Sequence, residues 1–116
     1  MNPLSSSLTL PSGAVLPNRI GKGAMTEGLA DRNDDATERH ARLYRTWSEG
    51  GAGMLLTGNV MVDRRYLERP GNVVIDEAFD EEALRAWAAA GTQAGNHLWM
   101  QINHPGRQCT RMSSSH

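Results

Sequence analysis

The stretch GMLLTGNVMV, residues 53–62, points to the class of the fold. It is a short apolar run bounded by glycine, and such a run is consistent with a strand that is buried on both faces. Strands of this kind occur in parallel sheets, because the helices that connect parallel strands cover the sheet. We therefore expect helices and further parallel strands on either side of residues 53–62.

Both flanking segments carry a helical pattern. Within residues 31–53, Thr37 is a suitable N-cap and the pair Gly50-Gly51 is a suitable stop. A second helix is predicted over about residues 80–94, where the first turn is acidic. The buried faces of the two helices are predicted to contain His40, Leu43, Tyr44 and Trp47, and Leu84, Trp87, Ala88 and Gly91.

The remaining elements complete an alternating pattern. A hairpin is predicted over residues 8–18 and two further strands over residues 18–26 and 97–104, while residues 63–75 are predicted as a charged loop. The order hairpin, β, α, β, α, β implies parallel strands joined by right-handed crossovers. Two α/β architectures fit this order: an open doubly wound sheet, and part of a (β/α)8 barrel. A complete barrel needs about 250 residues, so this chain would supply three of its eight strand units.

The composition excludes several classes of protein. The chain has 116 residues, enough for one small domain, and its 39% hydrophobic and 22% charged content is ordinary for a soluble protein. The net charge of -1 and the lack of a basic stripe argue against nucleic acid as a partner. No apolar run is long enough to predict a membrane span, and the pattern of the first residues leads us to expect no secretory signal. Because Cys109 is the one cysteine, we expect no internal disulfide and a cytoplasmic location.

Polar or small residues stand at the end of each predicted strand. They are Ala24-Met25-Thr26, Thr57-Gly58-Asn59 and Gln101-Ile102-Asn103-His104. The carboxyl ends of parallel strands share one edge, where α/β folds bind their ligands, although such residues can also simply begin loops. Amides paired with a hydroxyl suit a planar heterocycle with alternating carbonyl and N–H groups, such as a flavin or pyrimidine ring. They do not suit a metal.

Other candidate groups carry weaker signals. The spacing of His97, His104, Cys109 and His116 matches no zinc pattern, and Cys109 lacks an activating partner as a nucleophile. His40 is interpreted as a helix-face residue rather than a base, and Asp63-Arg64-Arg65 as a solvated loop. The glycines of GKGAMTEG lack the pattern of a phosphate loop. Arg107 could bind an anion or cap a neighbouring carboxylate.

Several motifs occur in the order of a known family. The segments LPNRIGKGAMT, TERHARLYRTWSEGGAGMLLTGNVMV and QINHPGRQ resemble the amino-terminal part of the old yellow enzyme family, the FMN-dependent NADH:flavin oxidoreductases and ene-reductases. The resemblance spans about residues 8 to 110. It implies a (β/α)8 barrel whose floor is closed by a small hairpin. This chain departs from the family pattern at two points: Ala24 stands in place of the usual Pro, and NHPGR in place of the commoner Trp-His-x-Gly-Arg.

The resemblance also implies roles for particular residues. Ala24, Met25 and Thr26 would lie beside FMN, with the Thr26 hydroxyl near flavin O4. Asn59 would lie over the pyrimidine edge, and the Gln101 amide would pair with flavin N3–H and O2. The protein would hold and tune the flavin, which carries the hydride.

The resemblance places the catalytic groups outside this chain. The family's substrate-gripping His/Asn pair, its proton-donating Tyr and its phosphate-binding loops lie beyond the third strand, so no catalytic residue is expected among residues 1–116. The expected whole reaction uses NAD(P)H to reduce FMN and then passes hydride to an activated alkene. The alternative is a non-catalytic truncated or split piece, acting only as an association module. In either case we expect self-association, or pairing with the remainder of the barrel, because the sheet has open edges.

Overall fold

The computed structural model describes residues 2–108, so Cys109 and His116 lie outside the described residues. In chain order the elements are η1 (Pro3–Ser5), β1 (Leu8–Thr9), β2 (Val15–Leu16), β3 (Gly21–Lys22), α1 (Glu38–Glu49), β4 (Met54–Met61), β5 (Val73–Val74), α2 (Glu81–Gly91), β6 (His97–Asn103) and η2 (Gly106–Gln108). The predicted alternation of strands and helices is confirmed. Strands β3 to β6 form a single parallel sheet, and β1 and β2 form the separate antiparallel hairpin.

Strand β4 is the centre of the sheet. Along one edge it pairs with β6, over nearly its whole length. The opposite edge is shared: β3 pairs with Met54 and Leu55, and β5 pairs with Val60 and Met61. Because two short strands divide this edge, β3 ends at Lys22 and the chain leaves the ladder there.

Two strand predictions need correction as a result. The predicted strand over residues 18–26 is only Gly21–Lys22, so Ala24, Met25 and Thr26 lie in an irregular segment after the strand rather than at its end. The charged loop predicted over residues 63–75 contains the strand β5. Two valines give too short an apolar run to be recognised without knowing that the edge of β4 is free at Val60.

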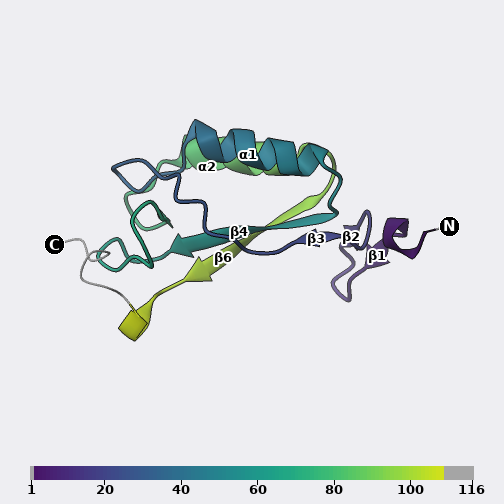
Figure 1. Ribbon diagram of the computed structural model, residues 1–116, viewed down its shortest axis with the longest axis horizontal. Coiled ribbons are helices and arrows are strands. Elements are labelled where there is room, and N and C mark those ends of the chain that lie inside the picture. Colours follow the sequence, from purple (N-terminus) through teal and green to yellow (C-terminus); the bar gives the residue numbers. More distant parts are fainter. Residues whose placement is uncertain (1, 109–116) are drawn as a thin grey trace.

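Both helices pack on one face of the sheet (Figure 1). The core between the layers contains Ala36, Tyr44, Leu55, Val60, Val73 and Trp87. The Tyr44 ring makes edge-to-face contacts with Trp47 and Trp87, at centroid distances of 5.0 and 5.4 Å. The Trp87 Nε1 group is buried and has no hydrogen-bond partner among residues 2–108. Within residues 2–108, the opposite face of the sheet carries no helix, as expected for an unclosed part of a barrel.

Side chains at the helix starts explain where the helices begin. Thr37 is the N-cap of α1: its hydroxyl accepts from the Arg39 amide, and the Thr37 amide donates to His40 Nδ1 over 3.0 Å. This confirms His40 as a helix-face residue whose ring nitrogen serves the cap, and its burial lowers the pKa of the imidazole. Asp80 caps α2 by accepting from the Ala83 amide.

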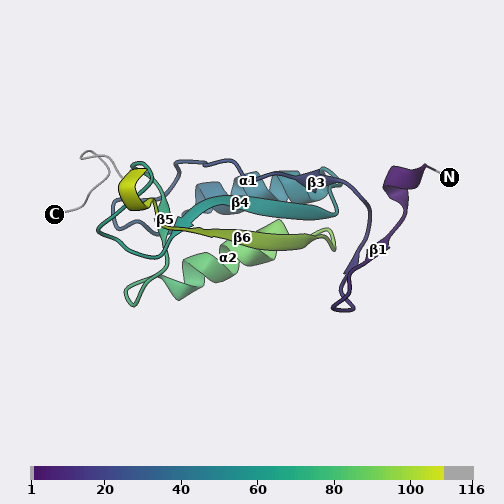
Figure 2. The ribbon, with the colours of Figure 1, turned by 90° about the horizontal axis from the view of Figure 1, so that it is seen from below.

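The hairpin lies at the end of the sheet where β4 and β6 begin (Figures 1 and 2). A hydrogen bond of 3.0 Å joins His97 Nε2 to the Val15 carbonyl oxygen, and Asn18 Nδ2 donates to the Gly51 carbonyl oxygen over 2.7 Å. The hairpin therefore covers the amino-terminal end of the strands. The carboxyl-terminal edge, where polar residues were predicted to gather, stays open.

None of the helices within residues 2–108 combines the length and the apolar content needed to cross a bilayer. Within the same residues, no group of three or more His, Cys, Asp or Glu side chains could hold a metal ion.

Candidate functional site

A β-bulge in β4 determines which residues face the open edge. Leu56 pairs with Trp99 and Asn59 pairs with Gln101, so β4 has one more residue than β6 between these two pairs. Leu55 and Val60 both pack in the helix-covered core. Strict alternation from Leu55 would have turned Asn59 towards the helices, but the extra residue places it on the opposite face. The bulge therefore brings Asn59 to the uncovered face, alongside Gln101.

Two side chains satisfy the backbone groups that the bulge displaces. The Gly58 amide donates to the carboxylate of Glu27 over 3.1 Å. The Gln101 backbone amide donates to the Thr57 hydroxyl oxygen over 3.0 Å, and that hydroxyl donates to the Gly58 carbonyl oxygen over 2.8 Å. Buried backbone groups that miss a ladder bond need such partners. Thr57 thus supports the strand ends rather than facing a ligand.

Gly58 allows the segment after β3 to lie directly on the bulge. A Cβ atom at Gly58 would stand 2.6 Å from Thr26 Cα and still closer to the Met25 carbonyl oxygen. Only a residue without a side chain permits this approach. The contact brings Thr26 beside Asn59, although Thr26 lies outside any strand.

A row of hydrogen-bonded side chains crosses the edge of the sheet. Asn59 Nδ2 donates to Thr26 Oγ1 over 3.1 Å, and Asn103 Nδ2 donates to Asn59 Oδ1 over 2.8 Å. Glu68, in the loop after β4, also makes a side-chain hydrogen bond with Asn59. Because the Thr26 oxygen accepts from Asn59, its own hydrogen remains free to donate, and no acceptor for it lies within residues 2–108.

Gln101 lies next to this row but outside its hydrogen bonds. It is solvent-exposed, and its side-chain amide has no partner within residues 2–108. Its register with Asn59 places it on the same face as Asn59 and Asn103. Of the other predicted site residues, Ala24 is exposed and Met25 is 55% exposed beside the bulge. The structure thus brings Thr26, Asn59 and Gln101 together, with Met25 next to them.

Charged and aromatic groups lie beneath this edge, between the sheet and α1. The Tyr44 hydroxyl donates to the Glu27 carboxylate, and burial together with this bond raises the pKa of Tyr44 well above its ordinary value. The Lys22 ammonium donates to the Leu56 carbonyl oxygen over 2.6 Å and lies 4.3 Å from the Trp47 ring centroid. Burial lowers the pKa of Lys22, and the nearby Glu27 carboxylate partly offsets the shift.

Arg64 corrects the interpretation of Asp63-Arg64-Arg65 as a solvated loop. Its guanidinium makes ion pairs with Asp76 at 3.1 Å and with Asp34 at 3.3 Å, and it donates to the Asn33 carbonyl oxygen. These bonds hold the pKa of Asp76 below its usual value, whereas burial raises that of Asp34. Arg64 therefore joins the loops that precede the two helices. The solvated description remains correct for Arg65, whose side chain is 69% exposed.

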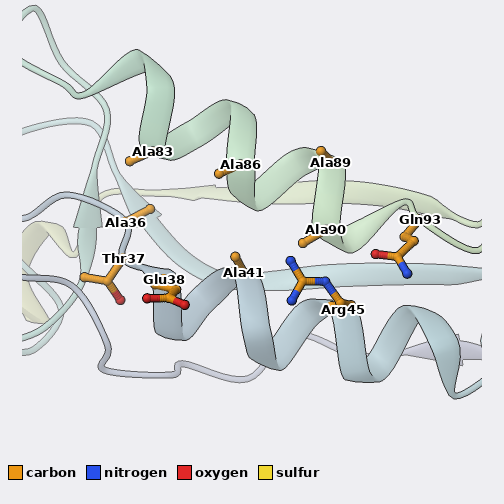
Figure 3. A pocket seen from close by; sticks show the side chains of 10 residues that line it. All are labelled: Ala36, Thr37, Glu38, Ala41, Arg45, Ala83, Ala86, Ala89, Ala90 and Gln93. Atoms are coloured by element: carbon orange, nitrogen blue, oxygen red, sulfur yellow. The ribbon is translucent and has the colours of Figure 1, made fainter.

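A groove between the helices lies away from this edge. It has a volume of about 490 Å³ and runs between α1 and α2 on the outer face, as Figure 3 shows. Its lining is mostly alanine: Ala36, Ala41, Ala83, Ala86, Ala89 and Ala90, with Thr37, Glu38, Arg45 and Gln93. Small side chains let the two helices lie close together.

Glu27 was missed by the sequence prediction, and Thr57 and Gly58, which were expected at the strand end, have roles there that were not predicted. Glu27 and Thr57 act on backbone groups that only the folded bulge displaces, so the sequence carries no signal for these roles. Gly58 did carry one, since an isolated glycine inside a strand suggests a bulge or a close backbone approach. Asn103 was expected only as a polar residue at the end of its strand, and the structure shows that it bonds Asn59 directly.

Known proteins share both the sequence and the fold of this chain. No protein-family model matches it. The NADH-dependent flavin oxidoreductase iccE of Talaromyces variabilis is 40% identical over 109 residues, which cover 90% of this chain and 26% of that protein. The NADH-dependent flavin oxidoreductase iliE of Hypocrea jecorina (strain QM6a) is 36% identical, covering 97% of this chain and 29% of that protein. The chain thus spans less than a third of these relatives.

Solved structures agree on the architecture. An old yellow enzyme homologue from Zymomonas mobilis matches 89% of this chain and 28% of its own, with a TM-score of 0.77 and 23% identity. Morphinone reductase matches 96% of this chain and 29% of its own, with a TM-score of 0.83 and 18% identity. These likenesses confirm the partial (β/α)8 barrel and exclude the open doubly wound sheet.

Proposed function

Because this chain belongs to the old yellow enzyme family of flavin oxidoreductases, we propose that it forms one side of an FMN site. Residues 1–116 would be the amino-terminal part of an FMN-binding barrel domain. One observation carries the proposal: two polar groups without a hydrogen-bond partner within residues 2–108 lie at the same face of the sheet. They are the Thr26 hydroxyl hydrogen and the Gln101 side-chain amide. Both lie at the carboxyl-terminal edge, where barrels of this kind bind ligands.

Each residue has a distinct part in this proposal. Gln101 offers a donor and an acceptor side by side, which matches the N3–H and carbonyl edge of a flavin pyrimidine ring. Thr26 donates to a flavin carbonyl oxygen, and Asn59 holds Thr26 and Asn103 in place. Met25 and Ala24 supply apolar contact beside the ring. The flavin itself supplies hydride transfer when bound, and the chain's residues bind and orient it.

The proposed whole reaction uses NAD(P)H as the reductant and an activated alkene as the acceptor. The curated relatives are named as NADH-dependent enzymes, which supports the reductant. The chain spans less than a third of their length, so the groups that grip and protonate the alkene would come from the rest of the barrel. We accordingly assign no catalytic residue among residues 2–108.

Flavin binding by a completed barrel tests the proposal. Residues 1–108 of this chain would be joined to the matching remainder of the Talaromyces variabilis relative, and FMN affinity measured by quenching of flavin fluorescence. Gln101→Ala should weaken FMN binding by about 1–3 kcal/mol, because buried polar groups of the ring lose their partner. Gln93→Ala is the matched control, since Gln93 bonds Glu49 on the helix side. Equal affinity for the Gln101→Ala variant and the control would contradict the role of Gln101.

The 116-residue chain alone should bind FMN no more tightly than about micromolar.

A second proposal is that the isolated chain associates with itself, as an association module would. One edge of β6 has no partner strand within residues 2–108, and Trp99, Met100 and Ile102 are 43%, 41% and 68% exposed. An apolar hollow of about 200 Å³ adjoins Met100. Exposed apolar edges promote pairing. Sedimentation velocity should show oligomers that Ile102→Lys disperses and that Leu4→Lys, at a remote exposed residue, does not. A monomeric wild-type chain would contradict this.

A further inference from the structure

Glu27 joins three separate parts of the fold through one carboxylate. It directly follows Thr26 in the irregular segment after β3, and it is half-buried. One of its oxygens accepts both the Gly58 amide of the bulge, over 3.1 Å, and the Tyr44 hydroxyl of α1. Tyr44 is fully buried in the core, so it is a fixed anchor for that carboxylate.

The bulge needs this acceptor. Gly58 is buried, and its amide has left the regular pairing between β4 and β6. A buried amide without an acceptor is costly, whereas a regular strand would keep its ladder bonds. Removal of the acceptor would therefore favour a rearranged strand. Because the side-chain period of a strand is two residues, loss of the extra residue turns Asn59 towards the helices.

The same carboxylate also sets the position of Thr26. Met25 and Thr26 touch Gly58 too closely for any side chain there, so this segment depends on contacts that hold it against the bulge. Glu27, one residue further on, makes such a contact through its hydrogen bond to the Gly58 amide. The distance between Thr26 and Asn59 thus follows from the bond between Glu27 and Gly58.

We propose that Glu27 is a positioning residue, which holds the β4 bulge and the segment after β3 together and thereby orients Thr26 and Asn59. The effect of Glu27 on flavin binding rests on the proposed function, but its effect on the bulge does not. Glu27 acts through its acceptor oxygen, and Tyr44 fixes that oxygen from below. Glu27 itself stays beneath the edge.

Hydrogen exchange at the Gly58 amide of the 116-residue chain tests the structural part. In Glu27→Ala this amide should exchange at least about tenfold faster relative to amides that exchange only on global unfolding. Glu27→Gln keeps a carbonyl oxygen of the same reach and should restore slow exchange. Ser48→Ala is the control for lost stability, because buried Ser48 bonds Asn96 and the Ala94 amide at the other end of the sheet. It should leave the Gly58 amide protected.

Two outcomes would overturn the proposal. A Gly58 amide that stays protected in Glu27→Ala would show that Glu27 only packs beside the bulge. Fast exchange in Glu27→Gln would show that charge, and not the acceptor oxygen, holds the bulge.

Flavin affinity in the completed barrel separates this proposal from the proposed function. Glu27→Ala should weaken FMN binding and Glu27→Gln should largely restore it, while Ser48→Ala should not change it. If Gln101→Ala leaves the affinity unchanged while Glu27→Ala still frees the Gly58 amide, the flavin assignment fails and the positioning role stands. If Gln101→Ala weakens FMN binding, but Glu27→Ala changes neither the FMN affinity nor the exchange of the Gly58 amide, the positioning role fails.

Discussion

The Asn103 side-chain amide donates to the Asn59 carbonyl oxygen over 2.8 Å and links the ends of the two neighbouring strands β4 and β6. Asn59 passes the connection on to Thr26, in a segment outside the sheet. Three stretches that are far apart in the sequence therefore meet in one row of polar side chains. Because the Asn103 and Asn59 side-chain amides each donate to the next side chain, the row holds its geometry before any ligand binds.

Asn59 and Asn103 should be energetically coupled. In a double-mutant cycle with Asn59→Ala and Asn103→Ala, we expect a coupling of about 0.5–1.5 kcal/mol in the free energy of unfolding, the usual net value of a hydrogen bond. Urea unfolding of the four proteins measures it. Combining Asn59→Ala with Gln93→Ala, on the helix side, should give simple additivity. Additivity within the asparagine pair would mean that the observed bond contributes nothing.

Gly58→Ala should be severely destabilising. The new Cβ would collide with backbone atoms of Met25 and Thr26, which cannot move as a flexible side chain would. We expect a loss of at least about 3 kcal/mol in the free energy of unfolding, at the high end for single substitutions.

Gly23→Ala is the matched control for that substitution. Among the described residues no atom lies within 4 Å of a Cβ placed at Gly23, and the φ of Gly23 is not positive, so stability should stay the same or rise slightly. Similar losses in the two variants would indicate a general intolerance of alanine in this segment rather than a close approach at Gly58.

The helices and the two long strands could be predicted from the sequence because their signals are local. The N-cap Thr37, the stop at Gly50-Gly51 and the apolar runs around Leu55 and Leu98 each act within a few residues. The class of barrel followed from the resemblance, since alternation alone also fits a doubly wound sheet.

The geometry of the site could not be predicted, because it depends on residues that meet only in the fold. The register shift in β4 appears only when Asn59 is paired with Gln101 on β6. The role of Glu27 depends on that shift, and the partners of Arg64 lie 30 and 12 residues away in the chain. The types of residue at the edge were visible in advance, but which of them bond to one another was not.

Tyr44 should make the chain sensitive to alkaline pH. Unfolded tyrosine has a pKa of about 10, and burial with the Glu27 bond raises the pKa of folded Tyr44 above it. Above about pH 10 the unfolded chain therefore loses a proton that the folded chain keeps. Stability falls there by up to about 1.4 kcal/mol per pH unit, while below pH 10 the contribution of Tyr44 is fully present.

Tyr44→Phe removes this titration. The variant should be less stable than the wild type at neutral pH, because the Glu27 bond is lost, but its stability should fall less steeply between pH 10 and 11. Urea unfolding at several pH values measures both slopes. Tyr66→Phe, at a residue that is 37% exposed, is the control. Parallel curves for wild type and Tyr44→Phe would contradict the prediction.

Arg64 should contribute more to stability than its neighbour Arg65. Arg64→Met leaves Asp34 and Asp76 without their shared partner, and we expect a loss of about 1–2 kcal/mol in the free energy of unfolding. Arg65→Met, with a largely exposed side chain, should leave the urea midpoint nearly unchanged. Equal midpoints for the two variants would show that the loops before the helices do not need Arg64.

The three tryptophans lie in three different surroundings, which makes the chain its own optical reporter. Trp87 is buried and its indole N–H has no hydrogen-bond partner within residues 2–108, so its emission should report the integrity of the core. Trp47 lies under the Lys22 ammonium and should respond when that charge is removed. Trp99 is half-exposed on the same face as Gln101, two residues before it in β6, so a coloured ligand at the edge should quench it first. Single-tryptophan variants could thus distinguish unfolding, deprotonation and ligand binding by light emission alone.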